Sequence, residues 1–136
     1  MSENLLEVQG LKIHYPVKSK NRLGNSVSWS KAVDGVSFTV KKGETFGVVG
    51  ESGCGKSTTG KAIIRLLEPT EGKILFDGKD ISGYSRKELA RKIQMIFQDP
   101  FSSLDPRMTA GTCIAEPLSV HKWEQRRNGG TGLFSL

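Results

Sequence analysis

The sequence predicts an α/β fold, and two observations support this prediction. First, a glycine-rich stretch lies between an apolar run at 45–49, typical of a buried strand, and a pattern at 59–67 in which apolar residues recur at helical spacing. Second, apolar and polar residues alternate over 32–40, which is the period of a half-buried strand. Strands and helices therefore follow one another along the chain.

The N-terminal third is predicted to be mostly extended. Residues 5–10 and 11–15 are predicted as two short strands. The second strand is expected to stop at Pro16 or to lie at a sheet edge, because proline has no N–H to donate to a ladder. Residues 18–30 are polar and are predicted to form an exposed loop.

The elements after the glycine-rich stretch are predicted from the spacing of apolar residues and from residues typical of helix and strand ends. Ser85 and Glu88 form a capping-box pattern, in which each residue bonds the other's backbone N–H at the start of a helix. We therefore expect a strand over 73–78, a helix after Ser85, a strand over 93–97 and a helix over 109–119 that breaks near Pro117. Residues 123–136 lack periodicity, and we expect a poorly ordered tail there.

Composition limits the function classes. A length of 136 residues suits one domain, and no apolar run approaches the ~20 residues that cross a membrane, so we expect no transmembrane segment. The acidic N-terminus is no secretory signal, so we expect a cytoplasmic protein. The net charge of +6 comes from scattered residues without interleaved aromatics, which favours a solvated surface over nucleic-acid binding. Two cysteines outside any Cys-x-x-Cys pair predict neither a zinc site nor a redox motif.

The glycine-rich stretch fits the phosphate-binding pattern of glycine, four free positions, then Gly-Lys-Ser/Thr. In such a loop, glycines let backbone N–H groups converge on a polyphosphate, and the following helix turns its positive end toward the anion. Lys56 would add charge at the terminal phosphates, and Ser57 would offer a hydroxyl to magnesium. A turn that binds nothing is the alternative, and the flanking strand and helix patterns argue against it. The predicted cofactor-binding residues here are Gly50, Glu51, Ser52, Gly53, Cys54, Gly55, Lys56, Ser57 and Thr58.

Several separated segments also share a family pattern. These are residues 32–38, 42–45, 50–58, 66–72, 76–81, 96–107 and 114–118. Over residues 4–122 the chain resembles the N-terminal part of an ATP-binding subunit of an ABC transporter, in the branch that imports oligopeptides, dipeptides or nickel. The resemblance implies a P-loop NTPase fold of the ABC ATPase type, with an N-terminal antiparallel β-subdomain and an incomplete parallel-sheet core. It also implies a partial ATP-binding domain at 1–122 and a divergent tail at 123–136.

The resemblance assigns roles to individual residues. Tyr15 would stack on adenine, although by itself it is an ordinary strand aromatic. The loop at 50–58 would hold the phosphates of ATP, with Lys56 on the β and γ groups. Ser57 and Gln98 would bind Mg²⁺, and Gln98 would also reach the attacking water and report nucleotide state to membrane subunits. In the family, two ATP-binding subunits enclose two ATP molecules on the cytoplasmic face of the membrane, attached through those membrane subunits.

The sequence also departs from the family pattern. The Leu-Ser-Gly-Gly-Gln signature, the apolar strand ending in Asp-Glu and the switch histidine are all missing, and His14 and His121 stand in the wrong places. We therefore interpret the chain as truncated, without the general base and expected to be inactive alone. Exposed apolar surface at 45–49 is expected to make it marginally folded or prone to aggregation.

Three functions remain open at this point. The first is a subunit that couples ATP hydrolysis to peptide import. The second is a nucleotide-binding remnant without ATPase or transport activity. The third is another phosphate-loop ATPase, such as a kinase or a DNA-repair enzyme.

Overall fold

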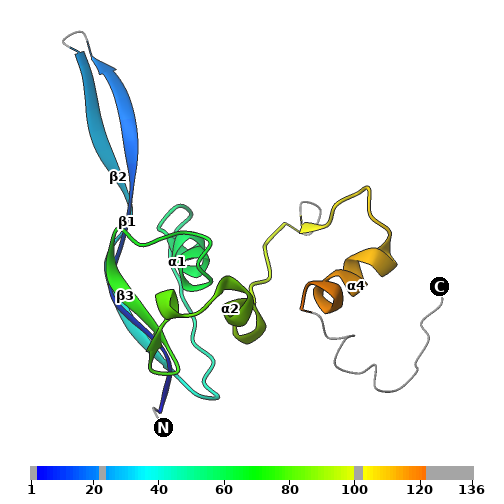
Figure 1. Ribbon diagram of the computed structural model, residues 1–136. Helices are drawn as coiled ribbons and strands as arrows, with labels where there is room; N and C mark the ends of the chain where they lie inside the picture. Colours follow the sequence, from blue (N-terminus) through cyan, green and yellow to red (C-terminus); the bar gives the residue numbers. More distant parts are fainter. Residues whose placement is uncertain (1–2, 22–23, 100–102, 122–136) are drawn as a thin grey trace, which may run out of the picture. The chain divides into compact units, whose positions relative to one another are not determined.

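The computed structural model describes residues 3–21, 24–99 and 103–121, and the predicted tail lies outside these ranges. The chain forms two compact units, Met1–Met95 and Ile96–Leu136. The first unit holds the sheet, α1 and α2, and the second holds α4 (Figure 1).

The sheet of the first unit has four strands in the order β2-β1-β3-β4, and every pairing is antiparallel. Its strands are β1 Asn4–Asn21, β2 Gly24–Lys41, β3 Glu71–Phe76 and β4 Lys79–Asp80. β1 and β2 form a long hairpin whose distal half extends away from the two helices (Figure 1). The antiparallel N-terminal β-subdomain is therefore confirmed.

The hairpin corrects two predictions. The strands expected at 5–10 and 11–15 are one continuous strand, and most of the expected loop at 18–30 belongs to β1 and β2. Within the described residues, β3 pairs with β1 only as far as Lys12, so the distal ribbon has no third strand beside it. Polar residues therefore fit there, which is why polarity misled the loop prediction. Pro16 pairs with Trp29 in this two-stranded part, where one edge of β1 has no described partner strand and a residue without an N–H is tolerated.

The strands predicted at 45–49 and 93–97 are not formed, and the described ranges contain no parallel strand pair. A strand needs a hydrogen-bonded neighbour, and neither segment has one here. Phe46 instead stacks on Phe38 with the ring centroids 5.1 Å apart, while the side chain of Val49 is 97% exposed. The apolar runs were identified correctly, but their partners are not among the described residues.

One hydrophobic core joins the sheet to the helices. α1 spans Lys56–Ile63, the 3-10 helix η1 spans Ile81–Gly83, and α2 spans Arg86–Lys92. The core consists of Val8, Leu11, Ile13, Val33, Ala62, Ile74, Ile81 and Leu89. Because all three helical elements contribute to it, they pack on the same face of the sheet.

The start of α2 confirms the predicted capping box. The Ser85 hydroxyl accepts from the Glu88 backbone N–H at 3.3 Å, and the Glu88 carboxylate accepts from the Ser85 N–H at 2.8 Å. The Ser85 hydroxyl and the Ser85 backbone N–H both stabilise the charged carboxylate, so they hold the pKa of Glu88 below its usual value.

In the second unit, α4 spans Ala110–Val120. Thr109 caps it by accepting from the Thr112 N–H at 3.2 Å. The predicted break near Pro117 is wrong, because the helix continues for three residues beyond it. Proline removes one donor from a helix, but here the next turn closes with the His121 N–H donating to the Pro117 carbonyl at 3.1 Å.

Gly55 fixes the start of α1 against the sheet. It is buried with φ 95°, and a Cβ at this position would overlap the carbonyl oxygen of Ala32 on β2. Ala32 lies where the β1–β2 register shifts, since Ile13 pairs with Val33 and His14 with Lys31. The strand backbone therefore abuts the end of the glycine-rich loop.

Gly60 provides a contrast on the same helix. A Cβ there would lie 3.5 Å from the Met95 Cε, an ordinary van der Waals distance. The two glycines therefore have different structural requirements.

We expect Gly55→Ala to lower the free energy of unfolding by about 1–3 kcal/mol or more, because alanine is strained at positive φ and meets the Ala32 carbonyl. Gly60→Ala should raise it by about 0.5–1 kcal/mol through helix propensity. Urea titrations followed by circular dichroism measure both. Equal effects of the two substitutions would contradict the packing described for Gly55.

Candidate functional site

The glycine-rich loop at 50–58, called the phosphate loop below, depends on its glycines for its backbone conformation. Gly53 and Gly55 have φ values of 83° and 95°, and a Cβ at Gly50 would lie 2.6 Å from the Cys54 Sγ. The Cys54 N–H donates to the Glu51 carbonyl at 3.4 Å and closes the turn. A compact loop of this kind can turn successive N–H groups toward an anion.

The first turn of α1 continues the site. Gly55 is its N-cap residue, no side chain caps it, and the first turn carries no acidic residue. The first N–H groups of the helix are therefore left for a ligand or for water. The dipole of α1 also favours an anion at this end.

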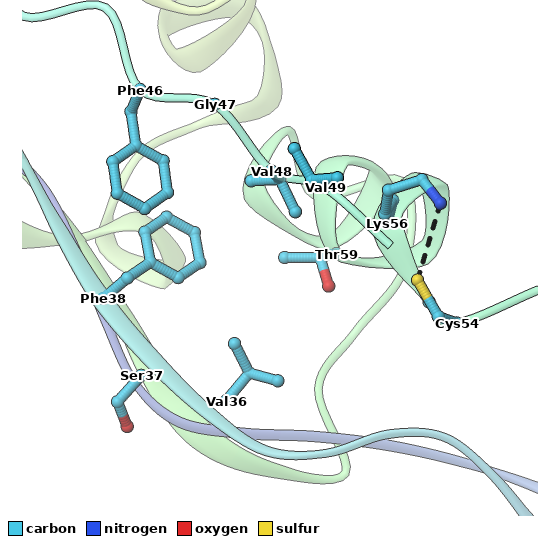
Figure 2. A pocket seen from close by; sticks show the side chains of 11 residues that line it. Val36, Ser37, Phe38, Phe46, Gly47, Val48, Val49, Cys54, Lys56 and Thr59 are labelled. Carbon is cyan, nitrogen blue, oxygen red and sulfur yellow. Dashed lines mark hydrogen bonds between the residues drawn. The ribbon is translucent and has the colours of Figure 1, made fainter. Parts of the chain in front are cut away.

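Lys56 folds back over the loop. Its Nζ donates to the Gly50 carbonyl at 2.5 Å and to the Glu51 carbonyl at 2.7 Å. The Cys54 Sγ lies 3.5 Å away and is a weak acceptor (Figure 2). The ammonium charge is thus held against the loop rather than free in solvent.

Ser57 and Thr58 occupy the same first turn, and the side chain of Ser57 is exposed. Within the described ranges, no cluster of three or more His, Cys, Asp or Glu residues could hold a metal ion. The donor set available here is a hydroxyl beside a phosphate loop. That set suits Mg²⁺, which takes few protein ligands and completes its shell with phosphate oxygens and water.

A hollow of about 360 Å³ lies between β2, the segment at 45–49 and α1. Figure 2 shows Phe38 and Phe46 facing one another on one side of it, with Val36, Val48 and Thr59 nearby. Its walls are mostly apolar, and the polar residues Ser37, Lys56 and Thr59 line part of it. We interpret it as packing surface beside the unpaired segment, not as the site of a polar ligand.

Tyr15 lies on β1 and is 41% exposed. It follows Ile13 by two residues, so both side chains lie on the same face of the strand. Ile13 is a core residue, and its cross-strand partner Val33 adjoins Gly55. The Tyr15 ring therefore lies on the sheet face that carries the phosphate loop, and its exposure leaves it free to contact a ligand.

The next residue along β1 belongs to a different surface. His14 Nε2 lies 3.1 Å from Asp34 Oδ1, and Lys31 Nζ lies 2.9 Å from Asp34 Oδ2. Hydrogen bonds from Lys31 and then His14 lower the pKa of Asp34. Because side chains alternate along a strand, this ionic cluster faces away from Tyr15.

Gln98 lies in the second unit, exposed and outside any helix or strand. Nearby, the Ser103 hydroxyl donates to the Asp99 carbonyl at 2.6 Å, and the Arg107 N–H donates to the Asp105 carboxylate at 2.9 Å. Each unit is described by itself, so the approach of Gln98 to the phosphate loop stays a prediction. The domain boundary predicted after residue 122 also stays a prediction.

Residues 50–58 form one continuous loop and helix start, and their role in binding phosphate stays a prediction. The structure adds a residue that sequence reasoning missed. Ala32 contributes a backbone carbonyl at an irregular point of β2. Such a contribution does not depend on the residue type, so the sequence alone does not indicate it.

None of the helices in the described ranges is long and apolar enough to cross a membrane.

Comparisons with known proteins agree with this geometry. The sequence profile of the family described as "ABC transporter" matches residues 33–129. The chain is 54% identical over 123 residues to the oligopeptide transport ATP-binding protein AppF of Bacillus subtilis, covering 88% of this chain and 37% of that protein. It is also 54% identical over 126 residues to OppF of the same organism, an oligopeptide transport ATP-binding protein, covering 90% of this chain and 39% of that protein.

Among solved structures, the dimeric ATP-binding cassette MJ0796, determined with ADP and Pi, matches with a TM-score of 0.65 and 24% identity. The match covers 96% of this chain and 50% of that one, and at this identity it shows the fold alone. The chain spans little more than a third of the length of the curated relatives described above. The family profile nevertheless covers well over half of the chain, around a phosphate loop with the expected backbone, so the chain belongs to the ABC transporter family as part of its ATP-binding domain.

Proposed function

We propose that this chain supplies the phosphate-holding part of an ATP-binding subunit of an ABC importer for oligopeptides or dipeptides. The observation that carries the proposal is the phosphate loop at the start of α1, with Lys56 held across it. The choice of peptides rests on the names of the relatives AppF and OppF. The membrane subunits, the second ATP-binding subunit and a position on the cytoplasmic face of the membrane belong to the same proposal.

Lys56 would bind a terminal phosphate of ATP without leaving the loop. An ammonium group has three donors. Two of them go to the Gly50 and Glu51 carbonyls, and the remaining interaction is the weak one with Cys54. A phosphate oxygen is a far better acceptor than a thiol, so it would replace that contact.

Mg²⁺ would be held by the Ser57 hydroxyl, with Gln98 as the second protein ligand. When bound, the ion neutralises charge that develops on the phosphates. Tyr15 would stack on the adenine ring, and such a contact tolerates any base because every base has a π-face.

Nucleotide binding without turnover is the second candidate function for this polypeptide. The 136 residues of this sequence carry phosphate-binding groups, and the signature and Asp-Glu strand that the family resemblance implies for hydrolysis are not among them. A further phosphate-loop enzyme class finds no support in the names of AppF and OppF of Bacillus subtilis and OppF of Salmonella typhimurium, which all concern oligopeptide transport.

Lys56→Ala should weaken Mg-ATP binding by about 10- to 100-fold, because a charge-assisted hydrogen bond contributes about 1.5–3 kcal/mol. Titration with a fluorescent ATP analogue, with unlabelled ATP as competitor, measures the affinity. Lys61→Ala is the matched control, since Lys61 is an exposed lysine on the same helix, and it should bind as the wild type does. Equal affinities of Lys56→Ala and wild type would refute the site. Steady-state ATP turnover that disappears in Lys56→Ala would refute the view that this chain only binds.

Tyr15→Ala should weaken ATP binding by about 5- to 100-fold, because base stacking on an aromatic contributes about 1–3 kcal/mol, and Tyr15→Phe should retain it. Inorganic tripolyphosphate has no base, so its affinity should not change in either variant. Val17→Ala is the control on the same face of β1, where Val17 is 45% exposed. A parallel loss of ATP and tripolyphosphate binding in Tyr15→Ala would show that Tyr15 supports the loop and does not contact a base.

A further inference from the structure

Arg65 occupies an unusual backbone position immediately after α1. Its φ is 56°, and Asp77 is the only other non-glycine residue in the described ranges with a positive φ. The Arg65 N–H donates to the Ala62 carbonyl at 2.9 Å, and the Leu66 N–H donates to the Lys61 carbonyl at 2.9 Å. Glycine usually takes this place at the end of a helix, because the left-handed conformation strains other residues. The arginine side chain must therefore contribute something that offsets the strain.

The Arg65 guanidinium reaches a different element. Nη1 donates to the Tyr84 carbonyl at 2.7 Å and to the Ile81 carbonyl at 3.3 Å. Ile81 is the first residue of η1 and Tyr84 is its C-cap residue, and the Ile81 carbonyl also accepts from the Tyr84 N–H at 3.2 Å. The side chain is only 18% exposed, and Nη2 lies 3.7 Å from the Glu68 carboxylate. Arg65 thus ties the end of α1 to the start of the segment 81–95.

The segment 81–95 contacts α1 a second time at the C-terminal end of the segment. Met95 lies beside Gly60, where a Cβ would be 3.5 Å from its Cε. Between these two attachments, Ile81 and Leu89 are buried in the core. Three residues after Met95 the chain reaches Gln98. α1 therefore carries Lys56 and Ser57 in its first turn and anchors the segment that leads to Gln98.

We propose that Arg65 is a positioning residue for the segment 81–95, the part of the chain that leads to Gln98. By fixing the segment 81–95 on α1, it makes the region before Gln98 respond when nucleotide binds at the first turn of the same helix. Arg65 touches neither the nucleotide nor the reacting atoms. The inference rests on the proposed nucleotide site, and it adds a residue that the phosphate-loop pattern does not include.

Hydrogen exchange of the full 136-residue chain with and without Mg-ATP tests this, read at the peptides covering 50–58 and 93–99. The main variant is Arg65→Gly, which removes the guanidinium and relieves the left-handed strain, so the turn itself is preserved. Arg65→Lys keeps the charge and a donor group but loses the planar guanidinium. Lys61→Met is the matched control, because it removes an exposed cation from the same helix.

In the wild type and in Lys61→Met, Mg-ATP should slow exchange at both peptides. In Arg65→Gly the protection at 50–58 should persist, and the nucleotide-dependent protection at 93–99 should fall at least threefold, with partial recovery in Arg65→Lys.

Undiminished protection at 93–99 in Arg65→Gly overturns the proposal. Loss at both peptides also overturns it, because Arg65 would then support the loop itself. A wild type protected at 50–58 but not at 93–99 refutes this inference alone, whereas no protection at 50–58 refutes the nucleotide site on which it rests.

Discussion

The contact between Gly55 and the backbone of β2 is the constraint on which the site depends. It sets the end of the phosphate loop directly against the sheet at the point where the β1–β2 register shifts. From there α1 runs back over the core through Ala62. The same contact fixes the loop on the sheet face that carries Tyr15. Because Gly55 has no side chain, the loop can lie against β2. This contact determines where Lys56 and the first turn of α1 lie relative to the Tyr15 ring.

Local signals predicted the parts of the fold that local chemistry determines. The glycine spacing at 50–58 requires particular backbone angles, and the structure has them at Gly53 and Gly55. The capping box at Ser85 needs only four consecutive residues. Each of these could be inferred because cause and effect lie close together in the sequence.

The predictions that were wrong, and the residues that were missed, depend on contacts between parts of the chain that are far apart in the sequence. Residues 45–49 have the composition of a strand, but a strand also requires a partner, and composition cannot supply one. The distal hairpin has the composition of a loop, yet its two segments pair in register from Pro16 and Trp29 onward. The roles of Ala32 and Arg65 could not have been predicted, because they depend on a carbonyl brought close by folding and on a guanidinium that reaches another element. The apolar hollow beside the loop likewise appears only in three dimensions.

The folded-back position of Lys56 has a consequence for the kinetics of ligand capture. The loop is closed around a cation that belongs to the protein, through bonds of 2.5 and 2.7 Å to its own carbonyls. An arriving polyphosphate therefore does not have to organise the loop, and little conformational entropy is lost on binding. Association should then be limited by diffusion and electrostatic steering, and the lifetime of the complex, more than its rate of formation, should set the affinity.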